Sequence, residues 1–130
     1  MAENRTPHER ALPNYENAVI PREKLERYCL DPEHVSSTRG KSSGSDKARV
    51  FQAVLGFGKA DWVLLKNLIL EELPFYEAMF RDEDEHGKRY TVELAIIGPN
   101  GNTGIVVTGW IVKVGADFPS LTMARCISGA

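Results

Sequence analysis

Positively charged side chains gather where the sequence predicts the start of a helix. Residues 34 to 49 include His34, Arg39, Lys41, Lys47 and Arg49. The free N–H groups and the partial positive charge of a helix N-terminus favour a bound phosphate, and nearby lysine and arginine side chains add to this attraction. We therefore treat this stretch as a candidate phosphate site. The competing interpretation is a solvated helix face next to a polar loop.

His34 is the residue of this stretch best suited to proton transfer. It follows Asp31-Pro32-Glu33 at the predicted end of a helix. An imidazole titrates near neutral pH and can act as a general base or a general acid. The alternative is a histidine that only hydrogen-bonds a backbone carbonyl.

The last two predicted strands carry a second group of candidate residues, Trp110, Lys113, Thr122 and Arg125. If these strands pair around the turn at 115–119, the four side chains share one sheet. A sheet face with cations, a hydroxyl and an aromatic ring can bind a phosphate backbone and stack a base. The alternative places Trp110 in the core and the cations on the solvent-exposed face. The acidic run 82–85 is interpreted as a solvated turn.

No motif specifies a cofactor or a metal ion. The sequence has no phosphate-binding loop, no dinucleotide fingerprint and no HExxH or GxSxG pattern. Cys29 and Cys126 lie far apart and form no CxxC pair, which favours two reduced thiols in the cytosol over a disulfide and argues against a structural zinc site. We therefore expect neither a cofactor nor a metal ion.

The composition is that of an ordinary globular chain with no overall attraction to nucleic acid. Its 130 residues match one domain, 42% of them are hydrophobic, and the net charge is −2. Binding of RNA must therefore depend on a local positive patch. The polar N-terminus lacks the apolar segment of a secretory signal, and no stretch resembles a membrane span. We expect a soluble cytoplasmic protein, or one delivered into a target cell without a signal peptide, and no membrane partner.

Helices are predicted in the first half of the domain and strands in the second. Residues 1–11 are expected to form a disordered or weakly docked tail, and residues 12–130 a single domain with a mobile Ser/Gly loop at 36–45. Apolar spacing predicts helices over 22–30, 46–55 and 61–73, with Gly56 ending the second. Alternation predicts strands over 90–96, 104–114 and 121–127. This order indicates an α+β fold, with N-terminal helices packed on a C-terminal antiparallel β-meander of three to four strands.

Several strings of the sequence resemble a small bacterial family of domains of unknown function. They begin with Leu12-Pro13-Asn14 and continue through Pro32-Glu33-His34, Asp46-Lys47-Ala48-Arg49, Leu55-Gly56-Phe57 and Asp61-Trp62 to Gly98-Pro99-Asn100-Gly101 and the strand with Trp110. The resemblance covers roughly residues 12 to 127. Members of this family occur alone and at the C-termini of large polymorphic toxins.

The layout also resembles the barnase–colicin–RelE class of metal-independent ribonucleases. In colicin D-like members a Lys-His-Ala string opens a helix beside a Phe-Gly pair, and a late strand carries Gly-Trp. The comparable stretches here are Asp46-Lys47-Ala48, Phe57-Gly58 and Gly109-Trp110. Lys47 stands in place of the histidine, so either His34 supplies the catalytic base or Lys47 acts only as an electrostatic stabiliser.

This resemblance implies a toxin-like endoribonuclease that cleaves RNA, tRNA included, by transesterification. A base removes the proton of the ribose 2′-hydroxyl, the oxygen attacks the adjacent phosphate, and cations stabilise the developing charge. The implied catalytic residues are His34 for proton transfer and, around the phosphate, Lys47, Arg49, Thr122 and Arg125. The implied contacts to RNA are Arg39, Lys41, Trp110 and Lys113, and no metal ion is required.

A ribonuclease toxin also implies a cognate immunity or antitoxin protein, with an acidic surface that covers the cationic one. Two other functions remain open. The first is a non-catalytic module that binds a protein partner. The second is an immunity-type protein that itself neutralises a toxin, and for this function the acidic run would matter more than the cations.

Overall fold

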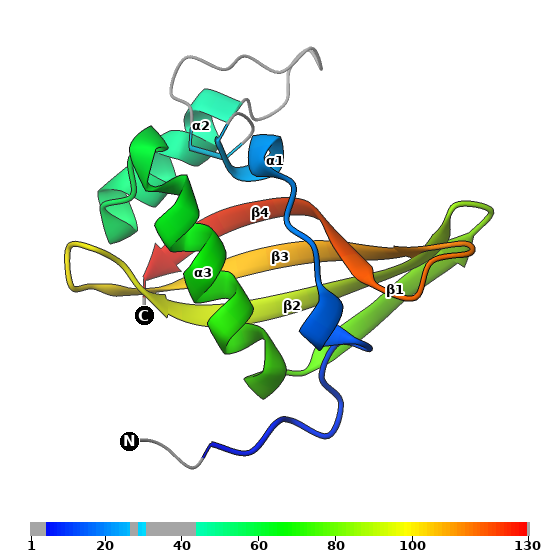
Figure 1. Ribbon diagram of the computed structural model, residues 1–130. Coiled ribbons are helices and arrows are strands. Elements are labelled where there is room, and N and C mark those ends of the chain that lie inside the picture. Colours follow the sequence, from blue (N-terminus) through cyan, green and yellow to red (C-terminus); the bar gives the residue numbers. More distant parts are fainter. Residues whose placement is uncertain (1–4, 27–28, 31–43, 130) are drawn as a thin grey trace.

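A computed structural model of the protein shows helices in the N-terminal half and a four-stranded antiparallel sheet in the C-terminal half (Figure 1). The structure describes residues 5–26, 29–30 and 44–129. The α-helices are α1 (Arg22–Glu26), α2 (Gly44–Val50) and α3 (Trp62–Glu72), and the strands are β1 (Ala78–Asp84), β2 (Gly87–Ile97), β3 (Thr103–Lys113) and β4 (Pro119–Gly129). Short helical turns are η1 (Tyr15–Asn17), η2 (Phe51–Leu55), η3 (Lys59–Asp61) and η4 (Leu73–Phe75). The predicted α+β fold is confirmed.

The sheet is a meander in the order β1-β2-β3-β4, and its two faces differ because successive side chains of a strand point to opposite sides. On one face Val92, Leu94 and Ile96 of β2 are buried. Figure 1 shows α3 crossing this face over β2 and β3, with α1 and α2 beyond β4. No described helix covers the other face. We call it the open face, and its members are Thr91, Glu93, Ala95, Ile105, Val107, Gly109, Met123, Arg125 and Ile127.

The α3 helix is attached to the sheet by one apolar side. Leu65 and Ile69 are four residues apart and therefore lie on the same side of the helix, and both are fully buried. They belong to the same core as Val92 and Leu94. Full burial of one such side chain contributes about 1.5–3 kcal/mol to folding, so this contact helps to hold the helix on the sheet.

The predicted helix over 46–55 consists of two pieces. The α2 helix ends at Val50, and the π-helical turn η2 continues the chain to Leu55. Gly56 follows with a φ of 83°, and its N–H donates to the carbonyls of Phe51 and Gln52. Glycine is favoured at this left-handed position because it has no Cβ atom. The predicted end of the helix at Gly56 is therefore confirmed.

Most of the acidic run 82–85 lies in a strand, whereas the prediction was a turn. Its first three residues belong to β1, and the turn consists of Glu85 and His86. Asp82 lies opposite Arg89 of β2, and the Arg89 Nη1 atom lies 3.1 Å from Asp82 Oδ1 and 2.8 Å from Asp84 Oδ2. Opposite charges directly across two strands stabilise the pairing, which is an effect of the register that local composition does not reveal.

The described part of the N-terminal segment contacts the end of α3 and the start of β1. The Arg5 guanidinium donates two hydrogen bonds to Glu72, of 3.1 and 2.9 Å, and its Cζ lies 3.8 Å from the centre of the Phe75 ring. The Ala78 N–H donates to the Arg10 carbonyl at 2.9 Å. These contacts attach the segment to the domain, although exposed pairs of this kind contribute only about 0–1 kcal/mol each.

Candidate functional site

The open face presents an acidic and a basic side chain on either side of Val107. Glu93 of β2 lies opposite Val107 of β3, which lies opposite Arg125 of β4. Two strand spacings, about 10 Å, separate the backbones of Glu93 and Arg125. Both charged residues are exposed, whereas Val107 is only 7% exposed. We call these three residues the central row. Its middle residue, Val107, is apolar, and each end carries one charged side chain.

The two charges of the central row are uncommitted. Neither Glu93 nor Arg125 forms an ion pair or a hydrogen bond with another described residue. Arg89 differs, since it is bound to Asp82 and Asp84. A free carboxylate can accept a proton, and a free guanidinium can bind a phosphate in a bidentate manner. The row therefore places a proton acceptor and a phosphate ligand within the reach of one substrate.

A β-bulge brings Thr122 to the same face. The register between β3 and β4 shifts between Gly109 and Trp110, so Thr122 has no partner on β3. A Cβ atom on Gly109 would lie 3.0 Å from Oγ1 of Thr122, which places the hydroxyl over Gly109. The structure therefore brings together two of the predicted phosphate-binding residues, Thr122 and Arg125.

A hollow adjoins the acidic end of the central row. It is lined by Tyr76, Glu77, Met79 and Glu93 and has a volume of about 250 Å³. Continuing the β1–β2 register by one residue from Ala78 places Glu77 beside Glu93. The lining combines an aromatic ring and a thioether with two carboxylates and has no cation, so it does not suit a phosphate.

Trp110 lies on the other face of the sheet from Arg125. It is 1% exposed, and its Nε1 donates to Thr108 Oγ1 at 2.8 Å, while the Thr108 hydroxyl donates to the Val92 carbonyl at 2.8 Å. These bonds satisfy buried polar groups, as cores require. An indole in this position does not reach RNA, so the core interpretation of Trp110 applies and the stacking interpretation does not.

Lys113 is exposed at the end of β3. It points to the same side as Val107, but six residues of strand separate them, which corresponds to about 20 Å. Lys113 is therefore outside the reach of a phosphate bound by Arg125, although a longer RNA could contact both.

Lys47 and Arg49 lie on α2, on the helix-covered side of the sheet. Lys47 is half-buried close to the Cys29 thiol. Burial raises the pKa of that thiol, and the Lys47 ammonium partly opposes the increase. The thiol donates to the Ala124 carbonyl of β4 at 3.1 Å. Lys47 and Arg125 therefore approach β4 from opposite sides, and the structure does not place them in one cleft.

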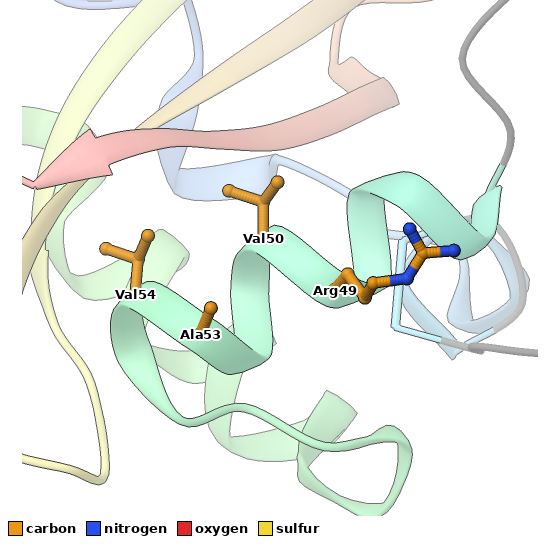
Figure 2. Close-up of a pocket in the computed structure, with 4 residues that line it drawn as sticks. All are labelled: Arg49, Val50, Ala53 and Val54. Atoms are coloured by element: carbon orange, nitrogen blue, oxygen red, sulfur yellow. The ribbon is translucent and has the colours of Figure 1, made fainter.

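Arg49 lines an apolar groove together with Val50, Ala53 and Val54 (Figure 2). The groove has a volume of about 410 Å³. Figure 2 shows the three apolar side chains projecting from one side of the helical segment, as expected for residues spaced three and four apart. Val50 is 37% exposed. This surface suits an apolar side chain of a partner better than a nucleic acid.

Three predicted site residues, His34, Arg39 and Lys41, lie outside the described residues. Proton transfer by His34 and RNA contact by the two cations stay predictions.

Glu93 is the residue of this site that the sequence analysis missed. The alternation of residues 90–96 in the sequence already places Glu93 on the polar side of its strand. Its position opposite Val107, in line with Arg125, depends on the register of three strands. Because a shift of one residue would move Glu93 to the other face, the sequence alone did not distinguish it from any exposed glutamate.

Among the described residues, no group of three histidine, cysteine, aspartate or glutamate side chains is arranged to bind a metal ion. None of the described helices has the length and apolar character needed to cross a membrane. Comparison with curated proteins and with solved structures returned no match. Residues 11–127 match the family described as "Domain of unknown function (DUF6883)". This match spans nearly the whole open-faced α+β domain, and the chain therefore belongs to the DUF6883 family.

Proposed function

We propose that this domain is a metal-independent endoribonuclease that cleaves RNA by transesterification on the open face of the sheet. The observation that carries the proposal is the central row, in which the unpaired Glu93 and Arg125 lie on either side of Val107. The resemblance to toxin ribonucleases provides independent support. The proposal does not depend on the net charge of −2, because a single arginine side chain can bind a phosphate with two parallel hydrogen bonds.

In this reaction Arg125 and the Thr122 hydroxyl hold the phosphate over the β3–β4 half of the open face. Glu93 removes the proton of the ribose 2′-hydroxyl, and the oxygen attacks phosphorus. The bond from phosphorus to the 5′ oxygen breaks, leaving a 2′,3′-cyclic phosphate and a 5′-hydroxyl. A general acid protonates the departing oxygen, and His34 is the candidate from the sequence for this role. The guanidinium stabilises the charge of the pentacoordinate transition state.

The test is cleavage of RNA by the purified protein in the presence of EDTA, with the ends of the products identified by mass spectrometry. We expect 2′,3′-cyclic phosphate and 5′-hydroxyl ends. Glu93→Gln should lower kcat/KM by about 100-fold or more, as loss of a general base does. Arg125→Ala should lower it by about 100- to 1,000-fold, as loss of a charge-stabilising donor does.

Matched controls exist on β1, where Glu83→Gln and Arg81→Ala make the same chemical changes away from the central row. They should retain wild-type rates. If the folded wild-type protein leaves RNA intact and does not slow the growth of cells that express it, the proposal is wrong. If the β1 controls lose as much activity as the central-row variants, the site is wrong.

A second function, a non-catalytic module that binds a protein, is favoured by the groove that Arg49 shares with three apolar residues. On this view the groove receives an apolar side chain of a partner, and an adjacent carboxylate of that partner lies near Arg49. An immunity or antitoxin protein with an acidic surface would have these properties. Intact RNA together with stable binding of such a protein, weakened by Ala53→Arg, would favour this function.

A further inference from the structure

We infer that the open face of the sheet also binds a second copy of this chain, in a two-fold symmetric dimer that packs the two open faces together. The inference does not rest on the ribonuclease function, because it concerns what covers the open face in the absence of RNA. It rests on the order of the side chains across β2, β3 and β4, which is complementary to itself.

The open face has an exposed apolar area at the end that adjoins the turn between β2 and β3. Ile97 is 64% exposed and Ile127 is 36% exposed, and Ala95 and Ile105 beside them are half-buried. Strand register places these four residues next to one another on the same face. A contiguous apolar area that no described helix covers is typical of a protein–protein interface.

A two-fold axis parallel to β3 brings the two open faces together without changing the direction of the strands. The axis lies above Val107, midway between the two sheets, so that Val107 faces Val107 of the second copy. It also reverses the order of the strands, so that β2 of each copy faces β4 of the other. Packed sheets usually lie about 10 Å apart with strand directions within about 30° of each other, and this arrangement satisfies both conditions.

The central row is complementary to itself under this symmetry. Glu93 and Arg125 each lie one strand away from Val107, on opposite sides, so Glu93 of each copy faces Arg125 of the other. Two ion pairs form across the interface in this way. Neither side chain has an ion-pair partner among the described residues of its own chain, so no existing pair has to break. Facing opposite charges select the partner and fix the register more than they add affinity.

The rows on either side of the central row are complementary in size. Towards the turn between β2 and β3, the next row consists of Ala95, Ile105 and Ile127. The symmetry places the small Ala95 of each copy opposite the large Ile127 of the other. On the other side of the central row, it places Thr91 of each copy opposite Met123 of the other. Small residues opposite large ones allow two packed layers to interdigitate, and burial of the apolar row favours association.

The dimer has a consequence for the proposed function. Glu93 and Arg125 cannot hold a nucleotide while each faces the second copy, so RNA and the second copy compete for the open face. The dimer is therefore the form of the protein that does not cleave RNA.

The experiment reverses the charges at the two ends of the central row and measures the Kd of the dimer by analytical ultracentrifugation. We expect a wild-type Kd of about 1–100 µM, as for weak interfaces of small area. Glu93→Arg and Arg125→Glu each place like charges opposite each other at both ends of the row. Each should raise the Kd by about 100-fold or more, because facing like charges strongly oppose association.

An equal mixture of the two single variants should restore association, because every facing pair in the heterodimer is again of opposite charge. The double variant should likewise form a homodimer. The matched controls Glu83→Arg and Arg81→Glu make the same changes on β1, away from the central row, and should keep the wild-type Kd. Circular dichroism spectra establish that all variants are folded.

A wild-type protein that stays monomeric at about 1 mM, ten times the weakest expected Kd, would overturn the inference and leave the open face to RNA or to another partner. Single reversals that keep the dimer, or a mixture that does not restore it, would also overturn the inference. No RNA is present in these measurements, so their outcome is separate from that of the ribonuclease proposal.

Discussion

The indole Nε1 of Trp110 donates a hydrogen bond of 2.8 Å to Oγ1 of Thr108, in the middle of the core and two residues along the same strand. Thr108 is fully buried, and its hydroxyl in turn donates to the Val92 carbonyl of the neighbouring strand. One hydroxyl therefore satisfies a side chain and a backbone group that have no access to water. This arrangement attaches the aromatic ring to the helix-covered face and leaves the open face without it.

Replacing Thr108 by valine should destabilise the fold by about 1–3 kcal/mol, because the similar shape is kept while the Trp110 N–H loses its acceptor and the Val92 carbonyl loses one donor. Urea denaturation followed by Trp fluorescence measures the change. Thr103→Val, at the exposed start of β3, is the matched control and should change stability by less than about 0.5 kcal/mol. Equal destabilisation by the two variants would show that the buried Thr108 hydroxyl does not stabilise the core.

Replacing Gly109 by alanine should disturb the site more than the fold. The new Cβ would lie 3.0 Å from both Thr122 Oγ1 and Met123 Cγ, which are side-chain atoms that can move. We expect little loss of stability in denaturation experiments. On the proposed function, cleavage of RNA should fall about tenfold, which corresponds to one weakened hydrogen bond.

The Thr122→Ala variant provides the comparison for this prediction, since it removes the same hydroxyl without crowding the strand. Its loss of activity should be similar to that of Gly109→Ala. Full activity in both variants would remove Thr122 from the site, and a large loss of stability in Gly109→Ala would mean that the backbone, not the side chains, absorbs the contact.

The β1–β2 hairpin should weaken in acid through Asp84. The pKa of this carboxyl is lowered, first by the hydrogen bond that its Oδ1 accepts from the His86 N–H and then by Arg89. Since the folded pKa lies below the unfolded value of about 4, the carboxylate stabilises the fold fully above pH 4, and this contribution is lost as the pH falls through the folded pKa.

We therefore expect the difference in free energy of unfolding between the wild type and Asp84→Asn to be constant from about pH 5 to 7 and to shrink below about pH 4. Denaturation at a series of pH values measures it. Glu83→Gln changes a neighbouring carboxylate on the same strand and should show a smaller dependence. A difference that grows as the pH falls would have the wrong sign for a lowered pKa.

Local sequence patterns determined most of the architecture. The alternation of Val92, Leu94 and Ile96 with polar or small neighbours predicted β2, and Gly56 predicted the end of the preceding helix. Both signals are local, because side-chain alternation and the need for a left-handed φ depend only on adjacent residues. The helices-then-strands order that follows from them was sufficient for the fold class.

The site depended on contacts between residues distant in the sequence. The same residue types allowed Trp110 to be a stacking surface or a core residue, and its bond to Thr108 decided this question. The acidic run was predicted as a turn, and its pairing with β2 corrected that prediction.

The sequence by itself determined the helix α3 and the strands β2 to β4, but not β1, part of which was predicted as a turn. Alternation also placed Glu93 on the polar side of its strand. Only the tertiary structure decided that Glu93 and Arg125 lie in line across Val107 and that Lys47 approaches β4 from the other side. The physical reason is that strand register and the Thr122 bulge set which side chains share a face. A shift of one residue reverses that assignment without changing the local pattern.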